Sequence, residues 1–254
     1  MMAAGHQRPQ PLVLVTGAAG ALGRATVHAL LAWGCDVIGL DRDAAVLDDA
    51  GRGYAGVRAD LLDEMAEDAV REALGDRPLH HLIGIAGGAL PGEPDAQDDL
   101  VGVTADLFRR SLEANLTSQF LVLRWVLPAL RLDPSADRSV TLTSSFNALS
   151  AQGMPAYSAA KAGLLGLMHA LVSPLGRDGI RINVVAPGTI RTPRTEALWG
   201  SVPGHFDRLE QGTALGRLGA PEDVARANVA VATMLTHVTG QVIVVDGGQS
   251  VVHR

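Results

Sequence analysis

Cysteine is almost absent from the 254 residues: Cys35 stands alone, so neither a disulfide within the chain nor a cysteine cluster for a metal is expected. Positive charge is also in deficit, with 21 Lys and Arg against 27 Asp and Glu. Nucleic-acid-binding proteins present a basic face, so a net charge of −6 argues against that class. No apolar run reaches the roughly 18 residues of a membrane-spanning helix, and residues 1–10 lack the apolar region of a signal peptide. We therefore expect a soluble, cytoplasmic protein that binds neither nucleic acid nor membrane.

Hydrophobic residues make up 47% of the chain and charged residues 19%, which is typical of a globular protein. Short apolar segments alternate with longer helical patterns, a rhythm typical of a parallel sheet covered on both faces. The pattern predicts one α/β domain over residues 1–254, with a doubly wound parallel sheet of about seven strands and a flexible N-terminus at residues 1–10. Trp33 and Trp125 are expected to pack inside it. The expected strands are 12–16, 36–40, 57–59, 81–85, 139–143, 180–185 and 241–245, and the expected helices are 22–33, 43–50, 62–74, 105–130, 157–175 and 221–235.

Two stretches, 87–102 and 191–219, break this rhythm, and both follow expected strands. Ligands of open parallel sheets bind beyond the carboxyl ends of the strands, so these stretches are expected to form the walls and the lid of a site. Residues 191–219 are the expected substrate lid. This lid has both basic and acidic residues, so it indicates no charge preference for a substrate; they are Arg191, Arg194, Arg208, Glu196, Asp207 and Glu210.

A glycine-rich turn joins the first expected strand to the first helix, in the sequence Thr16-Gly-Ala-Ala-Gly-Ala-Leu-Gly23. Backbone N–H groups of such a turn approach a pyrophosphate closely, and the helix N-terminus then stabilises its charge. Asp41 ends the next strand, where a carboxylate can accept hydrogen bonds from both hydroxyls of an adenosine ribose. The same carboxylate would repel a 2′-phosphate, which favours NAD over NADP. Two alternatives stay open: Asp41 only caps the following turn, or Arg42 binds a 2′-phosphate.

Tyr157 and Lys161 lie four residues apart on an expected helix and therefore on one face. A phenol has a pKa near 10, whereas base catalysis at neutral pH needs a value near 7, a difference of about 4 kcal/mol. One cation at about 4 Å supplies roughly that energy at an effective dielectric constant of 20. Burial of the phenol opposes the effect, so a second positive charge would help. A surface pair without function is the alternative for this spacing alone.

Taken in order with Ser144-Ser145 at the end of a strand, these features resemble the short-chain dehydrogenase/reductase family in its compact, non-extended branch. The resemblance runs from Leu12 to about Ser250. Further matches are Asp60-Leu61, Asn115, and the segments 183–192, 216–224 and 239–248. It implies a Rossmann-like fold and a hydride transfer between NAD(H) and a secondary alcohol or ketone. It also implies a homo-oligomer, a tetramer built through the long helices and the final strand. No cluster of His, Cys and carboxylate residues in the sequence suggests a metal site.

The resemblance implies specific residue roles. Tyr157 would be the general acid/base, Lys161 would lower its pKa and hold the nicotinamide ribose, Ser145 would bind the substrate oxygen, and Asn115 would hold a water for proton relay. The cofactor-binding residues implied are Gly17, Gly20, Ala21, Leu22, Asp41, Asp60, Leu61, Ala86, Gly87, Tyr157, Lys161, Ile190 and Thr192.

The sequence departs from the family pattern at three places. Ala21 stands where the family keeps the middle glycine of the loop. Gly84-Ile85-Ala86-Gly87 replaces Asn-Asn-Ala-Gly, so an asparagine that ties neighbouring strands is missing. The catalytic serine is ambiguous by one residue: the strand end favours Ser145, whereas the spacing to Tyr157 favours Ser144.

Two competing functions follow. One is an NADP(H)-dependent ketoreductase of the 3-oxoacyl or polyketide type, against which Asp41 speaks. The other is a cofactor-binding regulator that has lost catalysis, against which the intact Tyr157 and Lys161 speak. The substrate is expected to be a small alcohol or ketone.

Overall fold

The structure is a computed structural model that describes residues 10–43, 51–95, 100–150 and 153–251. The predictions for residues 1–9 and 44–50 lie outside the described residues. Seven strands form one sheet in the order β3-β2-β1-β4-β5-β6-β7, and each neighbouring pair is parallel. The strands are β1 (Leu12–Thr16), β2 (Asp36–Asp41), β3 (Tyr54–Arg58), β4 (His81–Gly84), β5 (Arg138–Thr143), β6 (Ile180–Pro187) and β7 (Val242–Val245).

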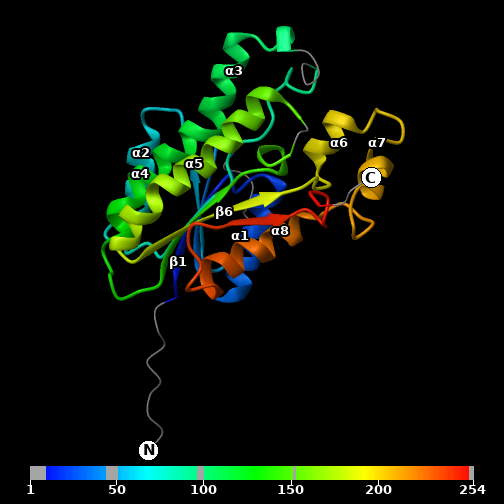
Figure 1. Ribbon diagram of the computed structural model, residues 1–254. Helices are drawn as coiled ribbons and strands as arrows, with labels where there is room; N and C mark the ends of the chain where they lie inside the picture. Colours follow the sequence, from blue (N-terminus) through cyan, green and yellow to red (C-terminus); the bar gives the residue numbers. More distant parts are fainter. Residues whose placement is uncertain (1–9, 44–50, 96–99, 151–152, 252–254) are drawn as a thin grey trace, which may run out of the picture.

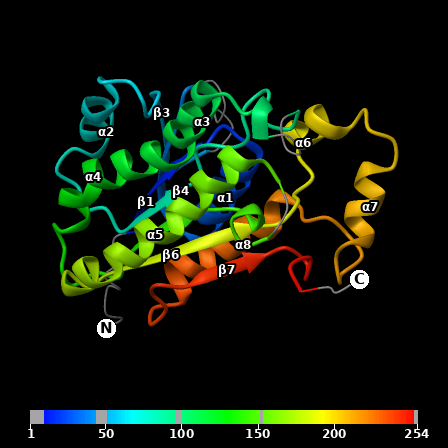
Figure 2. The same cartoon turned by 45° about the horizontal axis from the view of Figure 1, so that its top comes forward.

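Helices cover both faces of this sheet, which confirms the doubly wound α/β fold (Figure 1, Figure 2). On one face lie α1 (Ala21–Trp33) and α8 (Pro221–Val229), which is followed by the π-helical segment η5 (Ala230–Met234). On the other lie α2 (Ala66–Leu74), α4 (Ser118–Leu130) and α5 (Pro155–Arg177). The helix α3 (Ala105–Leu112) reaches α4 through the π-helical segment η3 (Glu113–Thr117), and two short 3-10 turns are η2 (Leu100–Gly102) and η4 (Phe146–Ala148).

The strand order reverses between β1 and β4, which are neighbours in the sheet although β2 and β3 separate them in sequence. A crevice opens beyond the carboxyl ends of two parallel strands at such a reversal. The strands beside it are anchored by a fully buried apolar core that includes Leu14, Leu82 and Leu142. The fold therefore places the ends of β1 and β4 rigidly at one edge of the sheet.

Several element bounds differ from the sequence expectation. The third strand begins at Tyr54 rather than at residue 57, because Tyr54 pairs with Val37 of β2. The second helix begins at Ala66 rather than 62, because the carboxylates of Asp60 and Asp63 each accept a backbone N–H two residues on and hold the preceding residues in turns. Trp125 is buried as expected, but Trp33 is 54% exposed, so the packing prediction for Trp33 is wrong.

The helix α5 departs from the expectation that no segment could span a membrane. By length and composition α5 is long and apolar enough, with a mean hydropathy of 1.2, although only 28% of that window is buried. Ser158, Lys161 and His169 interrupt its apolar residues, so no continuous run stands out in the sequence. The helix packs against β6.

Candidate active site

A single cleft of about 920 Å³ runs along the carboxyl edge of the sheet, from the end of β2 to the start of α5. It gathers almost every residue that the sequence singled out, including the glycine turn, the Tyr–Lys pair and both candidate serines. Residues that line it are Gly17, Gly20, Ala21, Leu22, Asp41, Asp60, Leu61, Ala86, Gly87, Ser144, Ser145, Tyr157, Lys161, Ile190 and Thr192. Asn115 is the predicted site residue that does not line it.

The glycine turn is shaped by contacts that leave no room for a side chain. A Cβ added at Gly17, whose φ is +68°, would lie 2.8 Å from the backbone nitrogen of Ala86, and one added at Gly23 would lie 2.0 Å from the carbonyl oxygen of Gly17. The helix α1 begins after Gly20 with no side-chain cap, so its first N–H groups lack partners in the helix. These donors and the positive end of the helix dipole suit an anion such as a pyrophosphate.

Asp41 joins the second strand to this turn. Its Oδ2 accepts the backbone N–H of Ala19 at 2.9 Å, and its Oδ1 accepts that of Asp43 at 3.2 Å. The carboxylate of Asp41 therefore caps the turn that follows it, as one of the two alternatives predicted. The same residue also lines the cleft, together with Arg42. Both the ribose-binding interpretation and the Arg42 alternative fit this position.

A side chain from α4 occupies the space beside Gly84, at the end of β4 where the expected asparagine is missing. A Cβ at Gly84 would lie 2.0 Å from Oε1 of Gln119, so Gln119 fills the space that glycine leaves. Nε2 of Gln119 donates to the carbonyl of Ala86 at 2.6 Å, which ties the loop after β4 to the long helix. The local sequence around Gly84 gave no signal of this, because the compensating residue is 35 positions away.

Asn115 supports the same loop one step further along. Its Oδ1 accepts the N–H of Gly88 at 2.6 Å, and its Nδ2 donates to the carbonyls of Gly88 and Ser111, each at 3.1 Å. The side chain is fully buried within the π-helical segment η3. All the side-chain hydrogen bonds described for Asn115 thus go to the backbone, so its amide group fixes the loop at Gly88. The expected role of Asn115 in holding a water stays a prediction.

Lys161 reaches the cleft from the first turns of α5. Its Nζ donates to the carbonyl of Thr143 at 2.9 Å and lies 5.6 Å from the centre of the Tyr157 ring. Burial, and to a lesser degree the nearby Arg194, lower the pKa of Lys161 to about 7. The ammonium therefore loses much of its charge near neutral pH.

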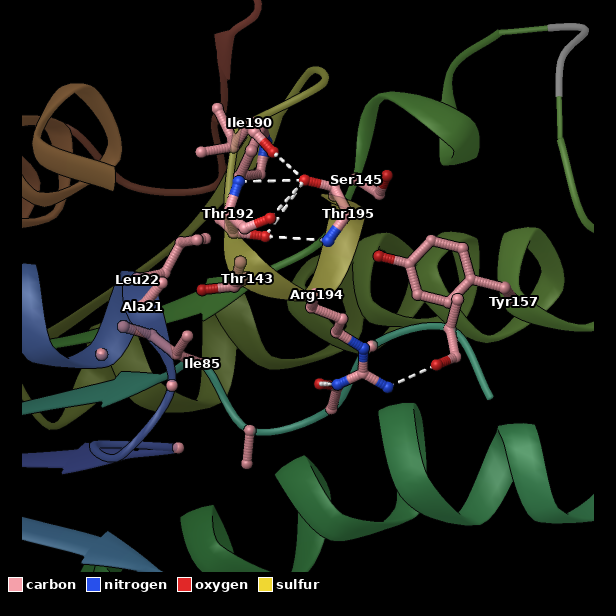
Figure 3. Close-up of a pocket in the computed structure, with 18 of the residues that line it drawn as sticks. Ala21, Leu22, Ile85, Thr143, Ser145, Tyr157, Ile190, Thr192, Arg194 and Thr195 are labelled. Carbon is pink, nitrogen blue, oxygen red and sulfur yellow. Dashed lines mark hydrogen bonds between the residues drawn. The ribbon is translucent and has the colours of Figure 1, made fainter. Parts of the chain in front are cut away.

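Tyr157 points its hydroxyl into the space between Ser145 and Arg194 (Figure 3). Burial raises the pKa of its phenol, while a hydrogen bond with the Ser145 side chain and the charge of Arg194 act in the opposite direction. Glu93 raises the pKa further. Burial thus outweighs the hydrogen bond with Ser145 and the charge of Arg194, in line with the expectation that a second positive charge would help.

The two serines at the end of β5 point in different directions. Ser144 donates its hydroxyl to the carbonyl of Lys161 at 2.8 Å, so this side chain is turned toward the backbone of α5. Ser145 caps the turn η4, accepting the N–H of Asn147 at 3.2 Å, and its hydroxyl contacts Tyr157. Of the two serine hydroxyls, that of Ser145 faces Tyr157 in the cleft, and the choice of Ser145 as the catalytic serine stays a prediction.

The segment 191–219, which was expected from composition to be a loop, contains two short helices, α6 (Pro193–Trp199) and α7 (His205–Gln211). Thr192 caps α6: its Oγ1 accepts the N–H of Thr195 at 3.2 Å, while Oγ1 of Thr195 donates to the carbonyl of Ile190. Figure 3 shows this hydrogen-bonded group at the rim of the cleft. Leu198, Trp199, His205 and Leu209 from these helices add a largely apolar wall.

Sequence reasoning missed the orientation of Arg194 and the burial of Glu93, which is 2% exposed. Neither position carries a motif, since both lie in segments of loop composition where side-chain direction is set by tertiary contacts. Among the residues that the structure describes, no group of three or more His, Cys, Asp or Glu side chains could hold a metal ion.

Comparison with known proteins bears on this geometry. A family profile described as Enoyl-(Acyl carrier protein) reductase matches residues 17–250. An uncharacterized oxidoreductase of Schizosaccharomyces pombe is 35% identical over 241 residues, covering 93% of this chain and 90% of that protein. Cis-4-hydroxycyclohexanecarboxylate dehydrogenase of Sinomonas cyclohexanicum is 32% identical over 257 residues, 98% of this chain and all of the relative.

A crystal structure points the same way. It is of an oxidoreductase from Burkholderia thailandensis that is assigned to the short-chain dehydrogenase/reductase family, and it has a TM-score of 0.85 and 35% identity over 95% of this chain and 93% of that one. The profile, the relatives and the sheet order agree. The chain belongs to the short-chain dehydrogenase/reductase family of NAD(P)-using oxidoreductases.

Proposed function

We propose that the protein transfers a hydride between NAD(H) and a secondary alcohol or ketone. The observation that carries the proposal is that one cleft joins the glycine turn and Asp41 at one end to Tyr157, Lys161 and Ser145 at the other. A dinucleotide suits such an elongated cleft, with its anionic centre at the start of α1. The nicotinamide ring would accept or donate the hydride, which is chemistry that no side chain supplies.

The residues of the chain would hold the cofactor and move the proton. We assign the pyrophosphate to the turn at Gly20 and to the N–H groups of Ala21 and Leu22, since the N–H of Gly20 itself donates to the carbonyl of Gly17 at 3.1 Å. We assign the adenosine to Asp41, Asp60 and Leu61. The nicotinamide side would be held by Ala86, Gly87, Lys161, Ile190 and Thr192, all of which line the cleft. The segment 191–219 would act as a lid over it.

Tyr157 would give a proton to the carbonyl oxygen in reduction and take one from the alcohol in oxidation. Ser145 would donate a hydrogen bond to the same oxygen and stabilise its developing charge. Lys161 would stabilise the phenolate, and Asn115 would hold the loop at Gly88 against the cofactor. Bound oxidised nicotinamide brings the positive charge that offsets the burial of the phenol.

Asp41 is the basis for proposing NAD over NADP. We expect kcat/KM with NAD to exceed that with NADP by at least about 10-fold, because a carboxylate beside a 2′-phosphate costs more than 1.4 kcal/mol. Steady-state oxidation of a panel of secondary alcohols with each cofactor measures this ratio. Asp41→Asn keeps the acceptor for Ala19 but removes the charge, so it should lower the ratio about 10-fold.

Asp43→Asn is the matched control, since Asp43 is exposed and lies outside the cleft, and its ratio should stay within about twofold. A higher kcat/KM with NADP in the unmodified protein would instead support the 3-oxoacyl or polyketide-type ketoreductase. The observation favouring that second candidate is Arg42, which lines the cleft beside Asp41.

We further propose that four chains associate through their long helices and final strands. Only 28% of the apolar window of α5 is buried in one chain, and Phe108 on α3, Phe120 on α4 and Val244 on β7 are each at least 39% exposed. Apolar surface of this extent marks contact with another protein surface. Sedimentation velocity should detect one species of four chains, and a single-chain species at micromolar concentration would contradict the proposal.

A further inference from the structure

Arg194 extends from the first turn of α6 across the cleft to the loop that follows β4 (Figure 3). Its Nη2 donates to the carbonyl of Ala89 and its Nη1 to that of Gly87 at 3.5 Å. The guanidinium lies directly over Gly88, where an added Cβ would come within 2.8 Å of Nη1. The side chain is thus held inside the cleft although it remains exposed to solvent there.

In the described part of the chain, the hydrogen-bond partners of the Arg194 guanidinium are the neutral carbonyl groups of Gly87 and Ala89. Among residues 10–43, 51–95, 100–150 and 153–251, no carboxylate forms an ion pair with it. Arg191, three residues earlier, is paired with Glu210 at 3.3 Å and Glu196 at 3.8 Å, outside the cleft. The sequence of the lid indicated no charge preference for a substrate, but the structure distinguishes these two arginines. Arg191 is neutralised on the surface, whereas Arg194 lines the cleft and is available to a ligand.

Arg194 also lies close to the reacting group. Its charge acts on both Tyr157 and Lys161, in each case lowering the pKa. The buried carboxylate that acts on the same phenol, Glu93, accepts the backbone N–H of Leu90 at 2.5 Å and does not pair with Arg194. A ligand whose oxygen contacts Tyr157 would have Arg194 within reach of a second group on the same small molecule.

Much of the remaining surface at this end of the cleft is apolar, and no further side chain with a fixed charge lines it there among the described residues. The apolar lining residues are Phe146, Met154, Leu198, Trp199 and Leu209, with Asn147 and His205 as polar neighbours. An unpaired guanidinium beside an apolar wall fits a compact molecule that carries one anionic group on a hydrocarbon body. A guanidinium has five N–H donors in a planar fork that matches a carboxylate in two parallel hydrogen bonds, so a carboxylate is the favoured anion.

We infer that Arg194 determines substrate specificity by binding the carboxylate of a hydroxy acid or oxo acid whose alcohol or carbonyl carbon faces Tyr157. The inference rests on the proposed function of the cleft, and it adds the class of substrate and the residue that recognises it. A neutral alcohol of the same shape would lack this contact and would bind more weakly.

The test measures binding rather than turnover, so that it does not depend on having found the substrate. The protein saturated with NAD is titrated with matched pairs, cyclohexanecarboxylate against cyclohexanecarboxamide and butanoate against butanamide, by calorimetry. We expect the carboxylate of at least one pair to bind about 10-fold to 100-fold more tightly than its amide. Arg194→Met should abolish this preference, Arg194→Lys should retain part of it, and Arg191→Met should leave it unchanged.

Three results would overturn the inference. The first is equal binding, or no detectable binding, of carboxylate and amide in both pairs. The second is a preference that survives in Arg194→Met. The third is an Arg194→Met protein that loses NAD affinity as strongly as carboxylate affinity, which would assign the guanidinium to the phosphates of the cofactor. A carboxylate preference without alcohol oxidation by the unmodified protein would uphold Arg194 as an anion site and refute the proposed hydride transfer, so the two failures are distinguishable.

Discussion

Replacing Tyr157 by phenylalanine is expected to reduce kcat at least about 100-fold while the affinity for NAD stays within about twofold. The variant removes only the hydroxyl that points between Ser145 and Arg194, and it keeps the ring that lines the cleft. Without that hydroxyl no group at this position can take the alcohol proton, whereas the glycine turn and Asp41 still hold the dinucleotide. Stopped-flow turnover and titration of NAD binding by protein fluorescence measure the two quantities separately.

Tyr54→Phe is a matched control, because Tyr54 is the other tyrosine of the chain and lies on β3, outside the cleft. Its kcat should change less than about twofold, and so should its NAD affinity. Equal turnover by Tyr157→Phe and the unmodified protein would refute the acid/base role. Tight NAD binding without turnover in the unmodified protein would support the regulator instead.

Lys161→Met should lower kcat about as much as Tyr157→Phe does. The same change should nevertheless stabilise the cofactor-free protein. The pKa of Lys161 falls from 10.5 to about 7 on burial, and each pKa unit corresponds to 1.36 kcal/mol. Burying the charged lysine therefore costs several kcal/mol at pH 7, and loss of its hydrogen bond to Thr143 offsets part of the gain. We expect the free energy of unfolding to rise by about 1–3 kcal/mol at pH 7.

The pH dependence gives the sign of this effect. Because the pKa of Lys161 is lower in the folded state, the unfolded chain binds more protons between pH 7 and 10.5, and the unmodified protein gains stability as the pH rises through that window. The advantage of Lys161→Met should therefore shrink from pH 7 to pH 10, as urea unfolding would measure. If the stability advantage of Lys161→Met over the unmodified protein stays constant or grows from pH 7 to pH 10, the pKa of Lys161 is not lowered in the folded protein.

The composition offers a direct check on that pKa. Lys161 is the only lysine in the chain, so protein labelled with ¹³C-lysine gives a single side-chain resonance. Loss of the proton from the ammonium shifts this resonance, so its chemical shift can be followed as the pH rises. The midpoint of that titration should fall near pH 7 in the cofactor-free protein. A midpoint near the ordinary value of 10.5 would remove the physical basis of the stability prediction.

The sequence predicted the architecture and most lining residues of the cleft because their signals are local. The glycine turn, Asp41 and the Tyr157–Lys161 spacing each lie within one element or one connection, and parallel topology then brings the strand ends together. Element bounds were less predictable, since β3 begins where Tyr54 finds its partner on β2. Such pairing is a tertiary property that the strand's own residues do not encode.

The rest of the site depends on where side chains point. Alternation along an extended chain turns Ser144 and Ser145 to opposite sides, but the sequence does not say which side holds the cleft. Arg191 and Arg194 look equivalent in composition, and only the fold pairs one with Glu210 and leads the other to Gly87. Short-range patterns therefore located the chemistry, whereas long-range packing fixed its orientation and charge.

The exchange of roles between Gly84 and Gln119 has an evolutionary consequence. Restoring asparagine at residue 84 alone would place its Cβ against Oε1 of Gln119, and shortening residue 119 alone would leave the Ala86 carbonyl without its donor. We therefore expect each single change to lower the stability of the protein more than the joint change does, so that the effects of the two positions depend on one another. Transferring the loop of a relative into this chain would therefore succeed only if the helix residue travels with it.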